Sequence, residues 1–191
     1  MNILIAGVGG QGSLLASRIL GEYYLSQGLT AKVSEVHGMS QRGGSVITYV
    51  RAGQQVAAPL VPEGEADLLI ALERLEALRW FEHLKPDGAV VMNTQKILPM
   101  PVITGSMPYP DEVVERIQKT GRRVAAMDAL ALARQAGDLR AVNVVLLGAA
   151  SKLLGGTPDG WEAALTACVK PKFLALNLKA FALGVNTTVL E

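Results

Sequence analysis

The sequence is 191 residues long, which is enough for one sizeable hydrophobic core. Half of the residues are hydrophobic, and 18 Lys and Arg balance 17 Asp and Glu, so the composition excludes a disordered chain and a protein that coats nucleic acid. The single cysteine excludes an internal disulfide, a CxxC redox pair and a four-cysteine iron–sulfur cluster held by this chain alone. No apolar run reaches ~18 residues and no basic segment starts the chain, so we expect a cytoplasmic protein that does not bind a membrane. The near-zero net charge argues against a nucleic-acid partner.

The first half of the sequence alternates strand and helix patterns. The apolar run NILIA stops at glycines, as a buried strand does, and residues 11–28 place their apolar side chains on one helical face. Later strand patterns are KVSEV, SVITYVRAG, ADLLIAL and GAVVMNT, with an amphipathic helix predicted at 73–84 before the last of them. In SVITYVRAG the alternation of Val46, Thr48 and Val50 is typical of a half-exposed strand, and QQVAAPLV is a candidate to pair with it as a hairpin.

The second half is mostly helical. In chain order we predict the helix DEVVERIQKTG, the strand RRVAAMDA and the helices ALALARQAG, RAVNVVLLGAASKLLG, WEAALTACVK and KFLALNLKAFALG. Asp128 is expected to cap the helix that follows it, Gly184 to cap the last helix, and Asn143 to be a buried amide with satisfied hydrogen bonds. The apolar side chains of the helices in residues 140–184 belong either to the hydrophobic core or to an interface with a partner, and periodicity does not distinguish the two. The whole pattern predicts one α/β domain over residues 1–191, a Rossmann-like open, mostly parallel sheet with helices on both faces and a helical C-terminal part.

A glycine-rich segment, GVGGQG, directly follows the first predicted strand and opens the first helix. It fits the GxGxxG pattern, in which glycines let backbone N–H groups and the helix N-terminus approach a phosphate; its residues are Gly7, Gly9, Gly10, Gln11 and Gly12. Glu35 follows Gly12 by 23 positions, near the spacing of ~20 at which an acidic residue holds a ribose. Two interpretations stay open: a nucleotide-binding loop, or a tight turn with a structural or partner-shared role.

The polar segment HGMSQRGGSV, residues 37–46, joins two apolar runs. Glycines at 38, 43 and 44 permit φ > 0, so the segment can fold back over the carboxyl edge of the sheet near the first glycine loop. The residues that we expect to face a ligand or partner there are His37, Ser40, Gln41, Arg42, Gly43 and Gly44. Arg42 offers a fork of donors to a carboxylate or phosphate. The alternative for each is a satisfied surface-loop residue, and His37 is the one candidate for a proton-handling group.

The segments GVGGQGSLLASRILGE, SEVHGMSQRGGSVITYVR and NLKAFALG resemble the gamma-type subunits of 2-oxoacid:ferredoxin oxidoreductases, most closely the beta subunit of indolepyruvate ferredoxin oxidoreductase. The resemblance extends over essentially the whole chain. It implies a subunit of a complex that oxidatively decarboxylates a 2-oxoacid, uses CoA as co-substrate and passes electrons to ferredoxin. It also implies that thiamine diphosphate, Mg and iron–sulfur clusters lie on a larger catalytic subunit.

The residues agree with that division of labour. The sequence has no GDG followed ~25 to 30 residues later by an asparagine pair, the pattern that we expect of a thiamine diphosphate and magnesium site. We therefore expect this chain to bind no cofactor or metal by itself, to be inactive alone, and to complete the site or interface of its partner. The alternative is a stand-alone Rossmann-type NAD(P)- or flavin-dependent oxidoreductase that uses the same glycine loop. The sequence does not decide whether the isolated chain forms a homodimer.

Overall fold

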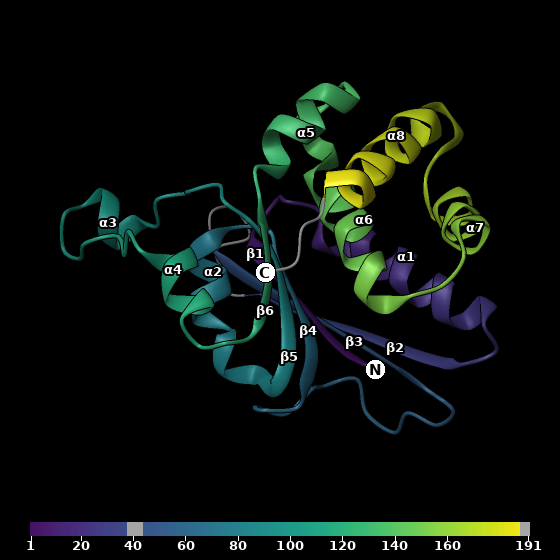
Figure 1. Cartoon of the computed structure of the whole chain (residues 1–191), viewed down its shortest axis with the longest axis horizontal. Helices are drawn as coiled ribbons and strands as arrows, with labels where there is room; N and C mark the ends of the chain where they lie inside the picture. The colour runs from purple at the N-terminus through teal and green to yellow at the C-terminus, as the bar shows by residue number, and fades with distance from the viewer. Residues whose placement is uncertain (38–43, 188–191) are drawn as a thin grey trace.

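The computed structural model describes residues 1–37 and 44–187 and forms one sheet covered by helices on both faces (Figure 1). The order of the six strands found in these residues is β2-β3-β1-β4-β5-β6. β1, β4, β5 and β6 run parallel to one another, whereas β3 is antiparallel to both β1 and β2. The predicted open, mostly parallel α/β sheet is confirmed. The strands are β1 (Asn2–Val8), β2 (Thr30–His37), β3 (Ser45–Gly53), β4 (Ala66–Ala71), β5 (Leu84–Asn93) and β6 (Arg123–Met127).

Helices cover the two faces unequally. Figure 1 shows α1 and α5 to α8 on one side of the sheet, α2 and α4 on the other, and α3 projecting away from the body. In the part of the chain that the structure describes, no helix is long and apolar enough to cross a membrane. The helices are α1 (Ser13–Ser26), α2 (Arg74–Arg79), η1 (Phe81–His83), α3 (Met100–Ile103), α4 (Val113–Gln118), α5 (Ala129–Ala136), η2 (Leu139–Ala141), α6 (Val142–Leu154), α7 (Pro158–Cys168) and α8 (Pro171–Thr187).

Strand side chains alternate between two hydrophobic cores. Ile3 and Ile5 of β1 pack in the core beneath α1 and α6, whereas Leu4 and Ala6 pack in the core beneath α2 and α4. Both faces of the central strands β1 and β4 are therefore buried, which is why they read as continuous apolar runs, whereas the edge strand β2 is largely exposed. The expectation of a half-exposed third strand is wrong: residues 46–50 of β3 are all buried, because this strand lies between two others and is covered on both faces.

The predicted hairpin partner of β3 is also wrong. β3 pairs along one edge with β1 and along the other with β2, in a register that joins His37 to Val46 and Thr30 to Gly53. Neither edge remains for residues 54–61, which form no strand. The actual hairpin is β2–β3, so the ends of the polar 37–46 segment lie at the carboxyl edge of β1.

α6 and α8 pack closely through two glycines. Every residue of α6 from Val142 to Ser151 is buried, so this helix is core. A Cβ at Gly148 on α6 would clash with the Phe181 backbone of α8, and a Cβ at Gly184 on α8 would clash with the Val145 carbonyl of α6. The expectation that Gly184 caps the last helix is wrong, because α8 continues to Thr187 and Gly184 serves helix–helix contact instead.

Gly148→Ala is expected to lower the free energy of unfolding by about 1 to 3 kcal/mol, because the added methyl forces two packed helices apart. Urea denaturation of the purified chain measures this. Gly21→Ala on α1 is the matched control: its Cβ would meet only Val33 Cγ2, at 3.7 Å. That variant should keep or gain stability, by up to about 1 kcal/mol, since alanine favours helix. Equal effects of the two substitutions would contradict the close packing of α6 on α8.

Candidate functional site at the carboxyl edge of the sheet

The carboxyl ends of the parallel strands meet at one edge of the sheet. β1 ends in the glycine loop, β4 is followed by Leu72 and Glu73, and β5 ends at Asn93. The antiparallel hairpin adds the end of β2 and the start of β3 to the same edge, since Val8 pairs with Ser45. This is the edge at which open α/β sheets place ligands.

The conformation of the glycine loop explains several of its glycines. Gly10 and Gly12 have φ of +101° and +82°, a region that side chains disfavour. Gly7 is needed for space, because a Cβ there would lie 2.9 Å from Leu72 Cδ1. Gly9 donates its N–H to the Gly44 carbonyl at 2.9 Å. The loop is thus fixed on β4 and on the end of the 37–46 segment.

Two side-chain amides hold the loop from inside. Gln11 accepts a hydrogen bond from Val8 N–H at 2.7 Å and donates to the Leu72 carbonyl at 3.0 Å, so its amide is already used within the fold. Asn143, only 2% exposed, donates to the Gly12 carbonyl at 2.8 Å and accepts from Val144 N–H. The prediction of a satisfied buried amide at Asn143 is confirmed.

A polar crevice of about 280 Å³ opens above this loop, and the predicted glycine loop, Glu35 and His37 come together there. Gly44 lies at its edge through the bond to Gly9, whereas Ser40, Gln41, Arg42 and Gly43 lie outside the described residues. The two ends of the polar segment therefore meet the glycine loop. The residues that line the crevice are Gly9, Gly10, Gly12, Ser13, Leu14, Glu35, His37 and Val46.

Hydrogen-bond donors and a carboxylate lie side by side in this crevice. Within residues 1–37 and 44–187, the N–H groups of Ser13 and Leu14 in the first turn of α1 find no acceptor, and the helix dipole adds partial positive charge. Glu35 Oε2 accepts from Ser13 Oγ at 3.0 Å and from Thr48 Oγ1 at 3.3 Å. The arrangement suits a ligand or partner group that both donates and accepts.

Glu35 is displaced relative to a dinucleotide-binding fold. In that fold the acidic residue ends the strand beside β1, but here β3 lies between β1 and β2. Its carboxylate also already accepts two hydroxyl groups. A ribose contact of Glu35 stays a prediction, and this topology weakens the dinucleotide interpretation.

The sequence patterns did not identify two further buried polar residues at this edge, Glu73 and Asn93. Glu73 is 1% exposed; its carboxylate caps α2 through Leu75 and Glu76 N–H and also accepts from Ile97 N–H at 3.1 Å and Tyr109 Oη at 2.6 Å. Burial first, and then the bond to Glu73, raises the pKa of the Tyr109 phenol. An acidic residue directly between an apolar strand and a helix is a cap signal that would have found Glu73.

Asn93, the second of them, ends β5 and is fully buried. It donates to the Leu72 carbonyl at 3.1 Å and accepts from Ala129 N–H at 3.2 Å, so it joins β4, β5 and the start of α5. Asp128 accepts from Ala131 N–H at 2.9 Å, which confirms it as the cap of α5. The sequence signal was the polar end of the strand GAVVMNT.

The single cysteine does not fit an iron–sulfur cluster. Clusters need about four thiolate ligands, and Cys168 is the one thiol of the sequence. Its side chain is partly buried at the end of α7, and burial raises the pKa of the thiol, which favours the neutral form. Among the residues described, no group of three or more His, Cys, Asp or Glu side chains could hold a metal ion.

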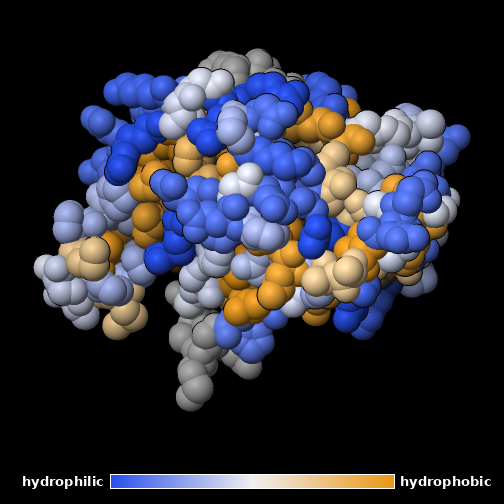
Figure 2. Space-filling model, turned by 90° about the horizontal axis from the view of Figure 1, so that it is seen from below, coloured by the Kyte–Doolittle hydropathy of each residue, from blue (hydrophilic) through white to orange (hydrophobic). Residues whose placement is uncertain are grey.

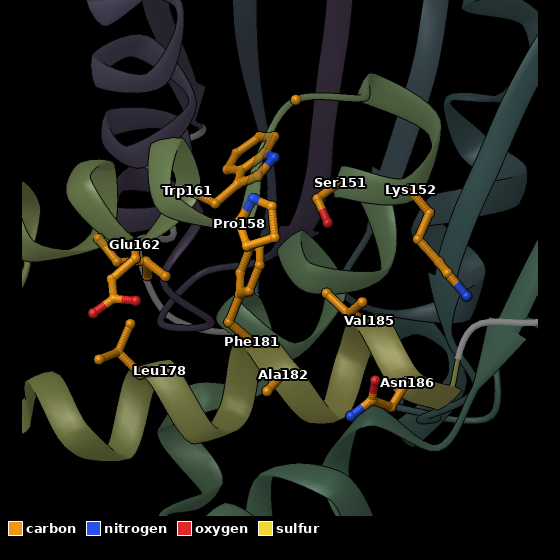
Figure 3. A pocket seen from close by; sticks show the side chains of 12 residues that line it. Ser151, Lys152, Pro158, Trp161, Glu162, Leu178, Phe181, Ala182, Val185 and Asn186 are labelled. Atoms are coloured by element: carbon orange, nitrogen blue, oxygen red, sulfur yellow. The ribbon is translucent and has the colours of Figure 1, made fainter.

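A second hollow, of about 420 Å³, lies between α6, α7 and α8 (Figure 3). Figure 3 shows Trp161, Pro158 and Phe181 together at this hollow, and the Trp161 and Phe181 ring centroids are 5.7 Å apart. Ser151 donates its hydroxyl to its own helix at Gly148. The walls are mostly apolar, so this hollow offers little chemistry compared with the polar crevice at the sheet edge.

Comparison with known proteins decides the family. The sequence model of pyruvate ferredoxin/flavodoxin oxidoreductases matches residues 2–187. The chain belongs to this family. A curated relative from Archaeoglobus fulgidus, named indolepyruvate oxidoreductase subunit IorB, is 42% identical over 99% of this chain and 96% of its own length.

Solved structures of this family share the fold. The keto/oxoacid ferredoxin oxidoreductase gamma subunit from Geobacter sulfurreducens superposes with a TM-score of 0.72 at 25% identity, covering 97% of this chain and 96% of its own. Pyruvate oxidoreductase subunit PORC from Thermotoga maritima gives 0.76 at 20% identity over 100% and 98%. The predicted resemblance to gamma-type subunits is confirmed, and a stand-alone dehydrogenase is not favoured.

Gln11→Leu is expected to lower the free energy of unfolding by about 1 to 3 kcal/mol, because it leaves Val8 N–H without its acceptor and removes a donor from the Leu72 carbonyl. Thermal and urea melts measure the loss. Gln27→Leu, at an exposed position whose amide has one long bond to Ser26, should change stability by less than about 0.5 kcal/mol. If Gln11→Leu did not change the free energy of unfolding, the structural role of the Gln11 amide would be contradicted and the side chain would be available for a ligand.

Proposed function

We propose that this chain is the small subunit of a CoA-dependent arylpyruvate ferredoxin oxidoreductase, with indolepyruvate as the leading substrate. The proposal rests on its family membership and on the relative named indolepyruvate oxidoreductase subunit IorB, which matches it almost end to end. In the proposed complex a 2-oxoacid and the CoA thiol become an acyl-CoA, CO₂ and a proton, and two electrons pass to ferredoxin. A single domain over residues 1–191 and a cytoplasmic location stay predictions.

Among the structural observations, the polar crevice supports the proposal most. It combines backbone donors, a carboxylate and an imidazole, but the described residues that line it include no cysteine or lysine and no acidic side chain other than Glu35. We infer that this edge completes a site on a larger subunit, where it orients CoA or the 2-oxoacid and excludes water. The family's thiamine diphosphate and iron–sulfur clusters would belong to that larger subunit; bound thiamine diphosphate supplies a nucleophilic carbon for attack on the ketone.

Reconstitution tests this proposal. The purified chain is mixed with the separately purified thiamine diphosphate-binding subunit, and reduction of ferredoxin or a viologen dye is followed with indolepyruvate and CoA. We expect turnover only when both subunits are present, because the chain has no ligand set for a cluster. Turnover of NAD(P)H or flavin by the chain alone, or full activity of the larger subunit alone, would contradict it.

Arg42→Ala is expected to lower kcat/KM of the reconstituted complex about tenfold or more, because the proposed guanidinium contact to a carboxylate or phosphate is lost. Steady-state kinetics with varied CoA and varied 2-oxoacid identify which of the two anions Arg42 contacts. Arg116→Ala is the control, since Arg116 is exposed on α4, away from the crevice lining. Wild-type kinetics for Arg42→Ala would remove Arg42 from the proposed site.

A further inference from the structure

One segment of the chain exposes apolar side chains on a projection. Residues 97–110, here called the apolar finger, contain no charged residue and include α3. Figure 1 shows α3 standing away from the sheet and the other helices, and in Figure 2 the projection at the left is pale to tan, without the deep blue of charged side chains. In residues 1–37 and 44–187, twelve large hydrophobic side chains are exposed; four are in the finger, namely Leu98, Met100, Ile103 and Met107.

The exposure is high enough to require an explanation. Met100 is 65% exposed, and Ile103 and Met107 are each 61% exposed. Single exposed apolar residues are ordinary, but a cluster of them on one element marks an interaction site. Nothing in the described part of this chain covers them.

The finger is ordered by its own contacts, which separates it from a loose loop. Thr104 N–H donates to Met100 O at 2.9 Å, and Ser106 and Met107 N–H both donate to Pro101 O, at 2.9 and 3.1 Å. Gly105, with φ of +75°, turns the chain back. Four of the nine prolines of the sequence lie between 99 and 110, which further restricts the backbone. A rigid apolar projection loses little conformational entropy when it binds.

The base of the finger is tied to the same strand end as the glycine loop. Glu73 accepts from Ile97 N–H and from the Tyr109 hydroxyl, so it holds both ends of the finger. Lys96 adds a contact over the Tyr109 ring, 4.3 Å from the centroid, and an ion pair to Asp111 at 3.3 Å. The residue before Glu73, Leu72, accepts from Gln11 of the glycine loop. Two adjacent residues therefore anchor the proposed crevice and the finger.

We propose that the apolar finger inserts into an uncharged, apolar groove of the larger catalytic subunit, as the anchor that seats the crevice on its partner. The proposal rests on the proposed function, which supplies that partner. A segment with no charged side chain can be buried in an apolar groove without desolvating a charge, and its anchoring through Glu73 and Leu72 places it beside the edge to which the proposed function assigns the partner. A second copy of this chain is the alternative occupant, and the cross-linking experiment below distinguishes it from the larger subunit.

The test uses Met100→Ser/Ile103→Ser in the full chain, with Leu25→Ser/Leu60→Ser as the matched control. Leu25 and Leu60 are both 53% exposed and lie outside the finger. We expect the finger variant to weaken the Kd for the larger subunit at least about tenfold, with the Tm of the isolated chain unchanged, because only the partner buries these side chains. The control should bind within about twofold of wild type.

A second measurement does not depend on the stability of the double variant. A photoreactive benzoylphenylalanine in place of Ile103 should cross-link to the larger subunit in the reconstituted complex, and one in place of Leu25 should not. Wild-type affinity of the finger variant, or no cross-link from position 103, overturns the finger as anchor while the proposed function stands. A cross-link to a second copy of this chain also overturns it. If the wild-type chain does not bind the larger subunit at all, the proposed function fails and the inference fails with it.

Discussion

The structure depends on how the backbone groups at the carboxyl edge of the sheet are satisfied. Parallel strands buried on both faces end with carbonyl and N–H groups that cannot reach water, and each one left unpaired would cost about 1 to 3 kcal/mol. The Leu72 carbonyl shows the solution: it accepts from Gln11 at 3.0 Å and from Asn93 at 3.1 Å. Two side chains from different strand ends thus join β1, β4 and β5 at one oxygen.

This constraint positions the candidate site. Because Gln11 is held at Leu72 and Asn143 is held at Gly12, the glycine loop has one fixed geometry from which the first turn of α1 points into the crevice. Glu73, the next residue along the chain, uses the same principle to hold the base of the apolar finger. The polar crevice and the apolar projection are therefore parts of one hydrogen-bonded edge. Such a connected edge suits the proposed role of positioning a ligand or partner.

Sequence patterns predicted the parts of the fold that local periodicity controls. The strand over residues 45–53, the glycine turn and the Asp128 cap all agree with the structure, because burial and capping leave local signatures. The hairpin partner of β3 was predicted wrongly. β3 pairs with β2 and not with residues 54–61, because strand pairing depends on the whole sheet and not on local sequence. In the sequence, Gly184 matches the pattern of a C-terminal helix cap. In the structure it lies within α8, where the absence of a side chain allows close contact with α6.

The candidate site was predicted in outline, and its chemistry only in part. The glycine loop, Glu35 and His37 do converge, because the topology brings these loops to one edge. Gln11 matches a ligand-binding motif, yet its amide is used by Val8 and Leu72, a role that depends on contacts 61 positions away. The finger carries no motif at all. Its four apolar side chains gave no prediction, and the structure shows them exposed on a segment that stands away from the sheet.

Hydrogen–deuterium exchange of the chain, with and without the proposed larger thiamine diphosphate-binding subunit, tests the central claim most directly. If the carboxyl edge contacts the partner, the backbone amides of residues 7–14, 35–46 and 97–109 should exchange more slowly in the complex. The exchange rates of the α7 amides should not change. Protection confined to α7 and the outer face of α8, with the carboxyl edge unchanged, would contradict the account.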